Sequence, residues 1–253
     1  MNITFLGTGT SQGIPVIACD CEVCTSPDTR NNRLRTSVMV EWKGKVIVID
    51  SGPDFRYQML REHVKQLDAL LFTHEHKDHI AGMDDIRAFN FKHDREIDVY
   101  AEARVQNALR NEFSYVFSGL DYPGLPRVVL HEIGNESFHV QGIDILPLRV
   151  MHYRLPVYGF RIGDFTYITD AKTISEEEKE KARGSKVLVL NALRKEAHIS
   201  HLTLQEAVAL AQEIDAETTY LTHLSHQMGL HEQVEQELPP NVRIAYDGLK
   251  LVI

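Results

Sequence analysis

The chain has 253 residues, of which 43% are hydrophobic, and it carries a formal net charge of -9. A domain of this length buries roughly three quarters of its unfolded surface, which is ample for a large core. The negative charge disfavours a broad nucleic-acid footprint, and no stretch approaches the roughly 20 apolar residues of a membrane span. Residues 1–7 lack the basic start and long apolar run of a signal peptide, so we expect a cytoplasmic protein that does not bind membranes.

Apolar, strand-like runs dominate the predicted secondary structure. In chain order, strands are expected at Ile3–Leu6, Ser37–Trp42, Lys45–Asp50, Ala69–Thr73, Ile97–Ala101, Val128–Ile133, Ser137–Val140, Ile143–Arg149, Tyr158–Ile162, Phe165–Thr169, Val187–Asn191, Thr218–Thr222, Val242–Tyr246 and Leu249–Val252. Helices are expected at Phe55–Val64, Arg104–Phe117, Ser175–Ala182 and Leu204–Glu213. Near-continuous apolar strands indicate sheets that are covered by helices on one face and by a second sheet on the other. No repeat or linker interrupts the sequence, so we predict one α/β (α+β) domain over residues 1–253 with four layers, helix/sheet/sheet/helix.

The segment Asp84–Pro126 has the least regular pattern. It carries five aromatic residues that we expect to be exposed: Phe89, Phe91, Tyr115, Phe117 and Tyr122. Such a segment could form a lid over a site, a dimer surface or ordinary packing, and the sequence leaves these alternatives open.

The run His74-Glu-His-Lys-Asp-His79 directly follows an apolar strand and is the richest source of chemistry in the chain. His74 and His76 are two positions apart, so they point the same way in extended backbone, whereas the adjacent Asp78 and His79 diverge. One short loop can therefore offer two ligands to one metal and two to its neighbour. Imidazole and carboxylate ligands suit zinc, manganese or iron. The alternative is a solvated polar loop, and ligand-type residues that recur downstream argue against it.

All three cysteines lie within six positions, at Cys19, Cys21 and Cys24. An odd number at this spacing fits a disulfide framework poorly and a metal-binding knuckle well. Three thiolates need a fourth ligand to complete a tetrahedral zinc site, and the neighbouring sequence does not show one. Three unrelated buried thiols are the alternative to a structural metal.

Three later apolar strands each run into a ligand-type residue, namely His152, Asp170 and His223. Strand ends at one edge of a sheet are a rigid place to mount a catalytic constellation. A lone histidine at a strand end is more often simply hydrogen-bonded. Together with residues 74–79, however, the three positions indicate a metal site.

The order His74-x-His76-x-Asp78-His79, followed by His152, Asp170 and His223, resembles the metallo-β-lactamase superfamily over essentially the whole chain. The resemblance implies a four-layer αββα sandwich with two divalent metal ions. It assigns the ligands as His74, His76 and His152 for one metal, Asp78, His79 and His223 for the other, and Asp170 as the bridge. Seven ligands for two metals leave positions open for water and substrate.

Asp50, which closes the run Val46-Ile-Val-Ile-Asp50, resembles the superfamily's carboxylate that buttresses the metal loop. The start of the chain, residues 5–15, resembles a phosphodiesterase branch that includes tRNA 3′-processing ribonucleases and cyclic-phosphate phosphodiesterases. Its glycines suit a tight turn that brings backbone near the site, and it lacks the Gly-Lys-Ser/Thr of a Walker loop.

The cysteine cluster is similar to that of the cyclic-phosphate phosphodiesterases. In those proteins a structural zinc is completed by a histidine three residues after the last active-site ligand. That resemblance selects His226 as the fourth ligand of Cys19, Cys21 and Cys24.

The segment Ala197–Ala207 resembles the part of this branch that supplies a catalytic histidine. Alignment on Thr203 and on the Glu-Ala pair that follows it selects His201. His198 is then either a partner of the site or simply exposed. Thr203 is also suited to begin a helix, so part of the motif is a helix cap.

The resemblance thus implies metal-assisted hydrolysis of a small phosphodiester, such as a cyclic phosphate of a sugar or nucleotide, with zinc, manganese or iron in the active site and one structural zinc. Asp78 would orient the attacking water, and His201 would stabilise the developing charge or protonate the leaving oxygen. Three alternatives stay open: a tRNA 3′-processing endonuclease, a thioester or β-lactam hydrolase on the same fold, and a metal-binding protein without activity. Nucleic acid is the less expected partner because the chain is acidic and lacks a basic Gly/Pro-rich arm. A homodimer is usual among similar proteins.

Overall fold

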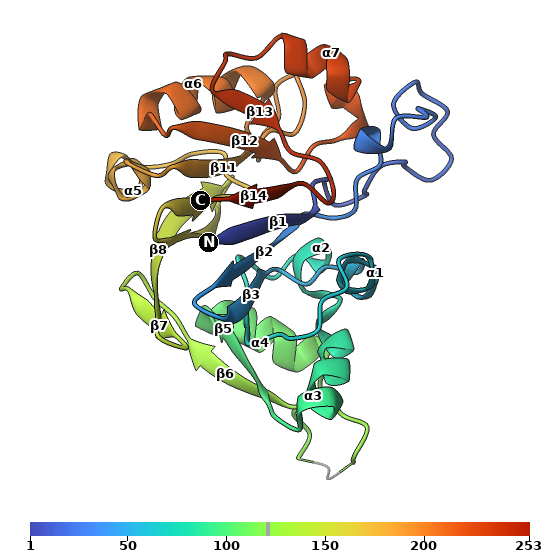
Figure 1. Ribbon diagram of the computed structural model, residues 1–253, viewed down its shortest axis with the longest axis vertical. Coiled ribbons are helices and arrows are strands. Elements are labelled where there is room, and N and C mark those ends of the chain that lie inside the picture. Colours follow the sequence, from blue (N-terminus) through green and yellow to red (C-terminus); the bar gives the residue numbers. More distant parts are fainter. Residues whose placement is uncertain (120–121) are drawn as a thin grey trace.

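The structure is a computed structural model that describes residues 1–119 and 122–253, and two mixed β-sheets lie face to face at its centre (Figure 1). The first sheet has the strand order β14-β1-β2-β3-β4-β5-β6 and the second β13-β12-β11-β10-β9-β8-β7. The strands of the first sheet are β1 (Asn2–Gly7), β2 (Ser37–Trp42), β3 (Lys45–Ile49), β4 (Ala69–Leu71), β5 (Ile97–Ala101), β6 (Val128–Glu132) and β14 (Lys250–Val252). Those of the second are β7 (Phe138–Val140), β8 (Ile143–His152), β9 (Leu155–Ile162), β10 (Phe165–Tyr167), β11 (Val187–Asn191), β12 (Thr218–Thr222) and β13 (Val242–Ile244).

Side chains of the central strands alternate between two buried environments. In β3, Ile47 and Ile49 pack between the sheets, whereas Val48 packs on the outer, helix-covered side. In β11, Val189 lies between the sheets and Leu188 lies under the helices. Because both faces of these strands are buried, their sequences read as continuous apolar runs.

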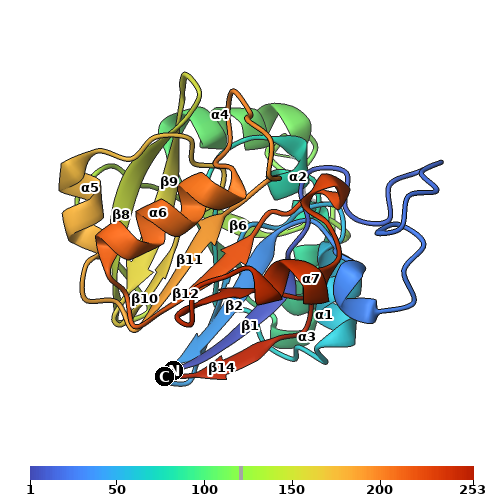
Figure 2. The same ribbon diagram turned by 90° about the horizontal axis from the view of Figure 1, so that it is seen from above.

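Helices cover the outer face of each sheet, which completes the four predicted layers (Figure 2). On the first sheet these are α1 (Phe55–Arg61), α3 (Arg87–His93) and α4 (Ala103–Glu112), and on the second α5 (Glu176–Ala182), α6 (Leu204–Ile214) and α7 (His231–Gln236). The short helices α2 (Lys77–Ile80), η1 (Thr29–Asn31), η2 (Met83–Ile86) and η3 (His226–Met228) lie in connecting segments. No helix of the described residues is long and apolar enough to cross a membrane.

Two of the predicted helices are shorter than expected, and the α-helices α2, α3 and α7 and the short helices η1, η2 and η3 were not predicted. The helix expected at 104–117 ends at Glu112, because Phe113 turns back to bury its ring against the first sheet. The helix expected at 55–64 ends at Arg61. Helix α3 was not predicted because its aromatic residues, Phe89 and Phe91, are two positions apart, and this spacing does not indicate a helix. Helix α7 also lacked a recognisable periodic pattern.

The segment 84–126 is more regular than expected, since α3, β5 and α4 occupy most of it. The expectation of exposed aromatic rings was wrong for two of its members: Phe89 of α3 is buried in the core between the first sheet and its helices, and Phe117 is half-buried against the same core. It is confirmed for the other three, Phe91, Tyr115 and Tyr122. Residues 120–121 lie outside the described residues.

Two glycines let the backbone beside the loop 74–79 pack closely. A Cβ atom on Gly52 would lie 2.1 Å from the carbonyl oxygen of Asp78, and one on Gly82 would lie 2.1 Å from the carbonyl oxygen of Gly52. In addition, the N–H of Ser51 donates to the carbonyl of His79 at 2.8 Å. The end of β3 and the helix α2 are therefore joined backbone to backbone.

We expect the substitution Gly52→Ala to lower the free energy of unfolding by about 2–3 kcal/mol, because backbone atoms cannot move away from the added methyl group. Urea denaturation followed by far-UV circular dichroism measures this. Gly134→Ala is the matched control, since a Cβ atom there meets no atom within 4 Å. Equal stability of the two variants would contradict the close packing described here.

Candidate metal centre

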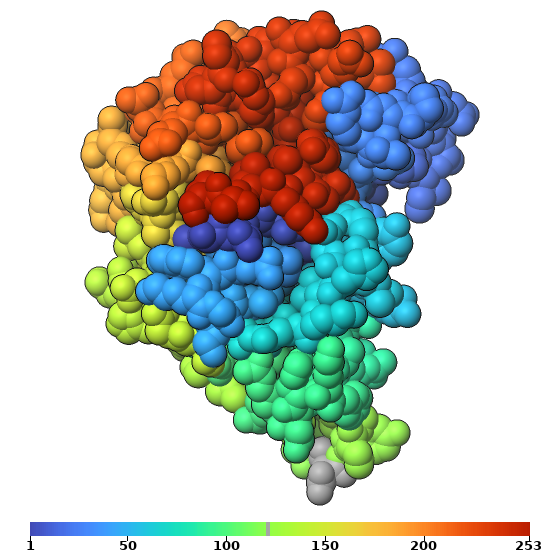
Figure 3. Space-filling view, in the orientation of Figure 1, coloured from blue at the N-terminus to red at the C-terminus, as the bar shows by residue number. Residues whose placement is uncertain are grey.

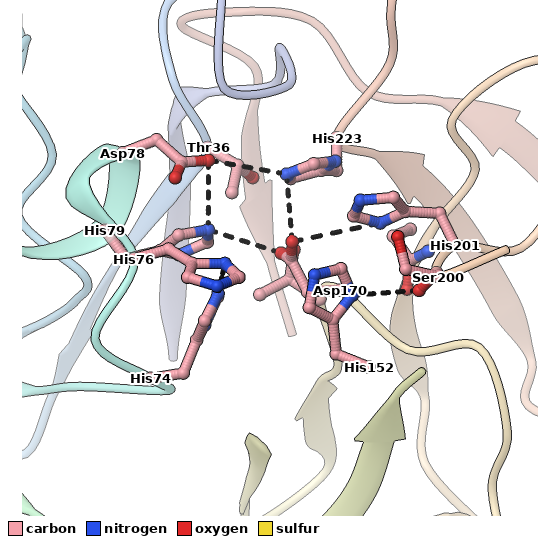
Figure 4. Close-up of polar contacts among 12 residues, drawn as sticks. Thr36, His74, His76, Asp78, His79, His152, Asp170, Ser200, His201 and His223 are labelled. Carbon is pink, nitrogen blue, oxygen red and sulfur yellow. Dashed lines mark hydrogen bonds and ion pairs between the residues drawn. The ribbon is translucent and has the colours of Figure 1, made fainter. Parts of the chain in front are cut away.

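Strand ends from both sheets meet at one edge of the sandwich, and their side chains point into a common space (Figure 4). The loop between β4 and α2 supplies two of them and α2 itself another two; the end of β8 supplies one, and the segments after β10 and β12 one each. The eighth comes from the loop before α6. The eight residues singled out from the sequence are all brought together here: His74, His76, Asp78, His79, His152, Asp170, His201 and His223.

One half of this centre consists of Asp78, His79, Asp170 and His223. The Nε2 atom of His79 lies 3.3 Å from an oxygen of each aspartate. The Nε2 atom of His223 lies 3.2 Å from Asp170 Oδ1 and 3.7 Å from Asp78 Oδ2. Ligands bound at about 2.1 Å to one cation are separated by about 3.0–3.5 Å. Both Nε2 atoms are buried and have no hydrogen-bond partner among the described residues, so the donor set fits a divalent cation.

The other half consists of three histidines whose rings face one another. His74 Nε2 and His76 Nδ1 are 2.9 Å apart, and the ring of His152 lies 5.3 Å from that of His76 between centroids. The Nδ1–H of His152 donates to the carbonyl oxygen of Ser200 at 2.8 Å, which leaves its Nε2 lone pair free. These rings therefore suit a second cation beside the first.

Asp50 fixes the rings of the metal loop from behind, as its resemblance to the buttressing carboxylate implied. Its fully buried carboxylate accepts the backbone N–H of Thr73 at 2.9 Å and the Thr73 hydroxyl at 2.8 Å. It also lies 2.7 Å from Nδ1 of His79. Because the Thr73 hydroxyl donates to Asp50, it accepts from Nδ1 of His74 at 3.0 Å. Both rings are thus set with Nδ1–H outward and Nε2 toward the centre.

The buried carboxylates of the centre stay ionised only because positive charge lies close to them. Burial opposes ionisation of Asp170, but His223 and His79 outweigh it and hold the pKa of Asp170 well below its usual value. Burial likewise acts to lower the pKa of His79, yet Asp78, Asp170 and Asp50 raise it well above its usual value. A proton on His79 or a metal ion can satisfy these charges, so metal binding should release that proton.

Three residues of the centre have left-handed backbone conformations. The φ angles are 64° at Asp50, 57° at Asp170 and 58° at His223. This region costs non-glycine residues roughly 1 kcal/mol or more each. Each residue lies just beyond a strand, where the turn redirects its side chain into the site. Such strain is typical of functional sites, and sequence alone does not reveal it.

His201 lies between the two halves of the centre and next to the open side. Its ring stacks on His223 with centroids 4.8 Å apart and lies 4.5 Å from the ring of His152. Its buried Nδ1 is 3.8 Å from Asp170 Oδ1, beyond hydrogen-bond distance. Burial, followed by the neighbouring His223, lowers the pKa of His201 to about 3. His201 is therefore a neutral imidazole near pH 7.

His198 lies beside the catalytic candidate rather than away from it. Its ring is 5.2 Å from that of His201, and its Nδ1 accepts the backbone N–H of Ser200 at 3.3 Å. Because the Ser200 carbonyl also orients His152, His198 is a partner of the loop that borders the site.

The cysteine knuckle and His226 form a second, separate cluster. The sulfur atoms of Cys19, Cys21 and Cys24 lie 3.3, 3.4 and 3.7 Å from Nδ1 of His226. A tetrahedral zinc ion with typical bond lengths places sulfur and nitrogen ligands about 3.6 Å apart. The backbone N–H of Cys24 lowers the pKa of the Cys21 thiol to about 6, whereas burial raises the pKa of the Cys24 thiol to about 11. Cys21 is therefore ready to bind as a thiolate, and Cys24 would lose its proton on binding metal. These four residues fit a closed structural site.

The knuckle loop stands out from the body of the molecule and lies against the C-terminal part of the chain (Figure 3). At its base, the side-chain oxygen of Asn31 accepts the backbone N–H of His231 at 2.8 Å. The preceding segment runs beside the active site, since the N–H of Leu224, next to His223, donates to the carbonyl of Thr8 at 3.0 Å. The glycine-rich start therefore brings its backbone next to the segment that carries His223, a proposed ligand.

The fold and these two clusters of ligand-type residues place the protein in the class of metal-dependent hydrolases. Residues 45–224 match the family model described as "Beta-lactamase superfamily domain". A solved diphosphatase from the PhnP family is 39% identical with a TM-score of 0.93, and the match covers 100% of this chain and 97% of that one. The chain therefore belongs to the metallo-β-lactamase superfamily and, within it, to the PhnP family. The predicted αββα sandwich is confirmed, and the fold implies divalent metal ions.

Other relatives carry different names. An octanoyltransferase of Porphyromonas gingivalis is 41% identical over 256 residues, which cover 100% of this chain and 52% of that protein. A ribonuclease Z of Staphylococcus haemolyticus is 26% identical over 168 residues, or 64% of this chain and 49% of that protein. The chain thus spans about half the length of these curated relatives. The short form of human tRNase Z, at 19% identity and a TM-score of 0.73, shares the fold.

Two residues that orient the proposed ligands were not identified from the sequence. The Thr73 hydroxyl orients the ring of His74 directly and that of His79 by way of Asp50. The backbone carbonyl of Ser200 orients the ring of His152. A hydroxyl beside a metal motif is a weak signal, and a backbone carbonyl leaves none. The ligand assignment itself stays a prediction.

Proposed function

We propose that the protein hydrolyses small phosphodiesters at a centre of two divalent metal ions, for which zinc, manganese and iron are candidates. The convergence of seven donor side chains with His201 at one sheet edge supports this best. One ion would be held by His74, His76 and His152, the other by Asp78, His79 and His223, and Asp170 would contact both. When bound, the ions supply a water of lowered pKa and positive charge toward the phosphate oxygens.

Asp78 is suited to orient the attacking water. In the metal-free protein burial opposes its ionisation, but the adjacent His79 outweighs this and holds the pKa of Asp78 far below its usual value. A bound divalent ion would supply the positive charge once His79 loses its proton. The carboxylate therefore stays ionised and can accept a hydrogen bond from a water throughout the reaction. Its role is to orient that water, because so weak a base would take up a proton poorly.

His201 is suited to stabilise charge on the phosphoryl group. As a neutral imidazole it can donate an N–H hydrogen bond to an oxygen whose negative charge grows in the transition state. Its pKa of about 3 makes a protonated ring rare near pH 7 in the metal-free protein. The ring's position beside His223 and Asp170 suits charge stabilisation, and protonation of the leaving oxygen stays the alternative.

The charge distribution supports a small substrate over precursor tRNA. The chain has a net charge of -9, and the knuckle loop that projects beside the C-terminal part carries Asp20 and Glu22 (Figure 2). An acidic projection is a poor surface for a phosphate backbone, since RNA binding depends on Lys and Arg neutralising phosphates.

Hydrolysis of a diphosphate is a second candidate, favoured by the 39% identical diphosphatase of the same family. The same centre could act on either bond, because both reactions place an anionic phosphoryl group between attacking and leaving oxygens. The octanoyltransferase name belongs to a protein of which this chain matches 52%, so an acyl thioester is retained only as a comparison substrate.

A substrate panel on metal-analysed protein tests the proposal. We expect turnover of bis-p-nitrophenyl phosphate and of a 2′,3′-cyclic nucleotide to exceed that of an octanoyl thioester by at least about 100-fold, which corresponds to about 2.7 kcal/mol of transition-state stabilisation. Turnover of a nucleoside diphosphate tests the second candidate activity, diphosphate hydrolysis. Precursor tRNA should not be cleaved. A faster thioester reaction or cleavage of the tRNA at its 3′ end would overturn the assignment.

We expect His201→Ala to lower kcat for bis-p-nitrophenyl phosphate by about 100–1000-fold, because a hydrogen-bond donor to the developing charge is lost. Metal content measured by mass spectrometry should stay unchanged. His139→Ala is the control, since that exposed histidine in β7 pairs with Asp144. If His201→Ala kept full turnover with full metal content, the proposed role would be wrong.

We expect roughly three metal ions per chain, because the two clusters together offer one closed tetrahedral site and one dinuclear site. Mild chelation should remove two ions and leave the one at the knuckle, whose ligands include three thiolates. Cys21→Ser should lose only the retained ion. At most two ions in fully loaded wild-type protein would exclude the knuckle site, the dinuclear centre or both.

A further inference from the structure

Four alternating charges run from the metal loop toward the second sheet. Glu75 lies in the loop between two proposed metal ligands and pairs with Arg104 of helix α4. Arg104 also lies 3.2 Å from Glu102, and Glu102 lies 3.4 Å from Arg149 of β8. The chain of charges therefore begins in the first sheet's metal loop and ends on a strand of the second sheet.

Arg104 contacts both parts of the chain that supply the three-histidine half of the centre. One terminal nitrogen pairs with Glu75, and the other donates to the carbonyl oxygen of Pro156 at 2.6 Å. Pro156 lies opposite Met151 in the β8–β9 hairpin, next to His152. A single guanidinium thus joins the loop of the first sheet to the hairpin of the second.

The pair is sheltered enough for its geometry to matter. The side chains of Arg104 and Glu75 are 33% and 24% exposed, and Glu75 Oε2 is buried without a hydrogen-bond partner among the described residues. Fully exposed ion pairs are worth little because both side chains move freely. Here the planar fork of the guanidinium bonds two fixed acceptors in different directions, which an ammonium group cannot reproduce.

We propose that Arg104 is a positioning residue of the metal centre, which fixes the separation between His74 and His76 on one sheet and His152 on the other. This inference rests on the proposed dinuclear centre. Three imidazoles bind one ion tightly only when their separation is correct before binding. Arg104 therefore raises the affinity of this half of the centre for metal, although it touches no ligand ring.

Cobalt(II) is a suitable probe, because thiolate ligation gives an absorption band that imidazole and carboxylate ligation lacks. Cobalt binding at the cysteine knuckle can therefore be measured separately from binding at the imidazole–carboxylate centre. We expect Arg104→Met to lower cobalt affinity at the imidazole–carboxylate centre by about 10–100-fold, as is usual when a group that orients metal ligands is lost. The knuckle band should titrate as in wild type. Arg104→Lys should recover part of the loss, since an ammonium can bond Glu75 or Pro156 but lacks the fork.

Arg110→Met is the matched control. Arg110 lies on the same helix, and its guanidinium rests 4.9 Å over the ring of Phe117. Urea denaturation of the metal-free proteins separates positioning from folding: both variants should be fully folded under the binding conditions, and only Arg104→Met should weaken metal binding. Glu75→Gln combined with Arg104→Met should cost no more affinity than Arg104→Met alone if the two residues act as a unit.

The possible outcomes distinguish this inference from the proposed function. If wild-type protein binds no cobalt outside the knuckle, the dinuclear centre itself is refuted. If wild type binds it and Arg104→Met binds it equally well, or if Arg110→Met weakens binding as much, the positioning role alone is overturned.

Discussion

The centre depends on one buried carboxylate that must find hydrogen-bond donors. Asp50 is fully buried at the end of β3, and an ionised carboxylate there is costly without partners. Thr73 supplies two donors and His79 a third, so the residue just before the loop and the last residue of the loop bind the same side chain. Six residues of loop are thereby fixed at both ends. The ring orientations of His74 and His79 follow from this bond set, since each Nδ1–H that points outward leaves Nε2 inward.

The site belongs to the contact between two sheets and to neither sheet alone. The loop 74–79 extends from the first sheet, whereas His152, Asp170 and His223 extend from the second. The apolar core between the sheets, where side chains interdigitate with little freedom, sets the spacing of the two sheets on which these ligands stand. Polar contacts also join the two sheets at this edge. The Leu224 N–H, next to His223, bonds the Thr8 carbonyl after β1, and Arg104 bonds the β8–β9 hairpin. A core substitution far from the metals can therefore alter ligand geometry.

Residue types revealed more of this centre than local structure did. Histidines and aspartates after apolar strands indicated a metal site because few other roles need that combination, and buried strands indicated the layered fold. Left-handed backbone at Asp170 and His223 left no trace in the sequence, since it is imposed by the turn each strand must make. His226 was found through resemblance alone, because 202 positions separate it from Cys24. The burial of Phe89 was missed because its spacing from Phe91 hid a helix.

Charge bookkeeping at the centre explains how an acidic protein can favour an anionic substrate. In the proposed loaded state, two divalent ions contribute four positive charges, while Asp78 and Asp170 contribute two negative ones and the histidines are neutral. The carboxylate of Asp50 behind the loop contributes a third negative charge. The centre then keeps a net positive charge, although the whole chain has a net charge of -9. The attraction acts at short range where water is excluded, whereas the acidic surface is screened beyond roughly 8–10 Å. A phosphodiester or diphosphate gains from this local field, and a neutral thioester or lactam gains much less. The same separation of local from net charge disfavours a long RNA, whose backbone would meet the acidic surface as well as the centre.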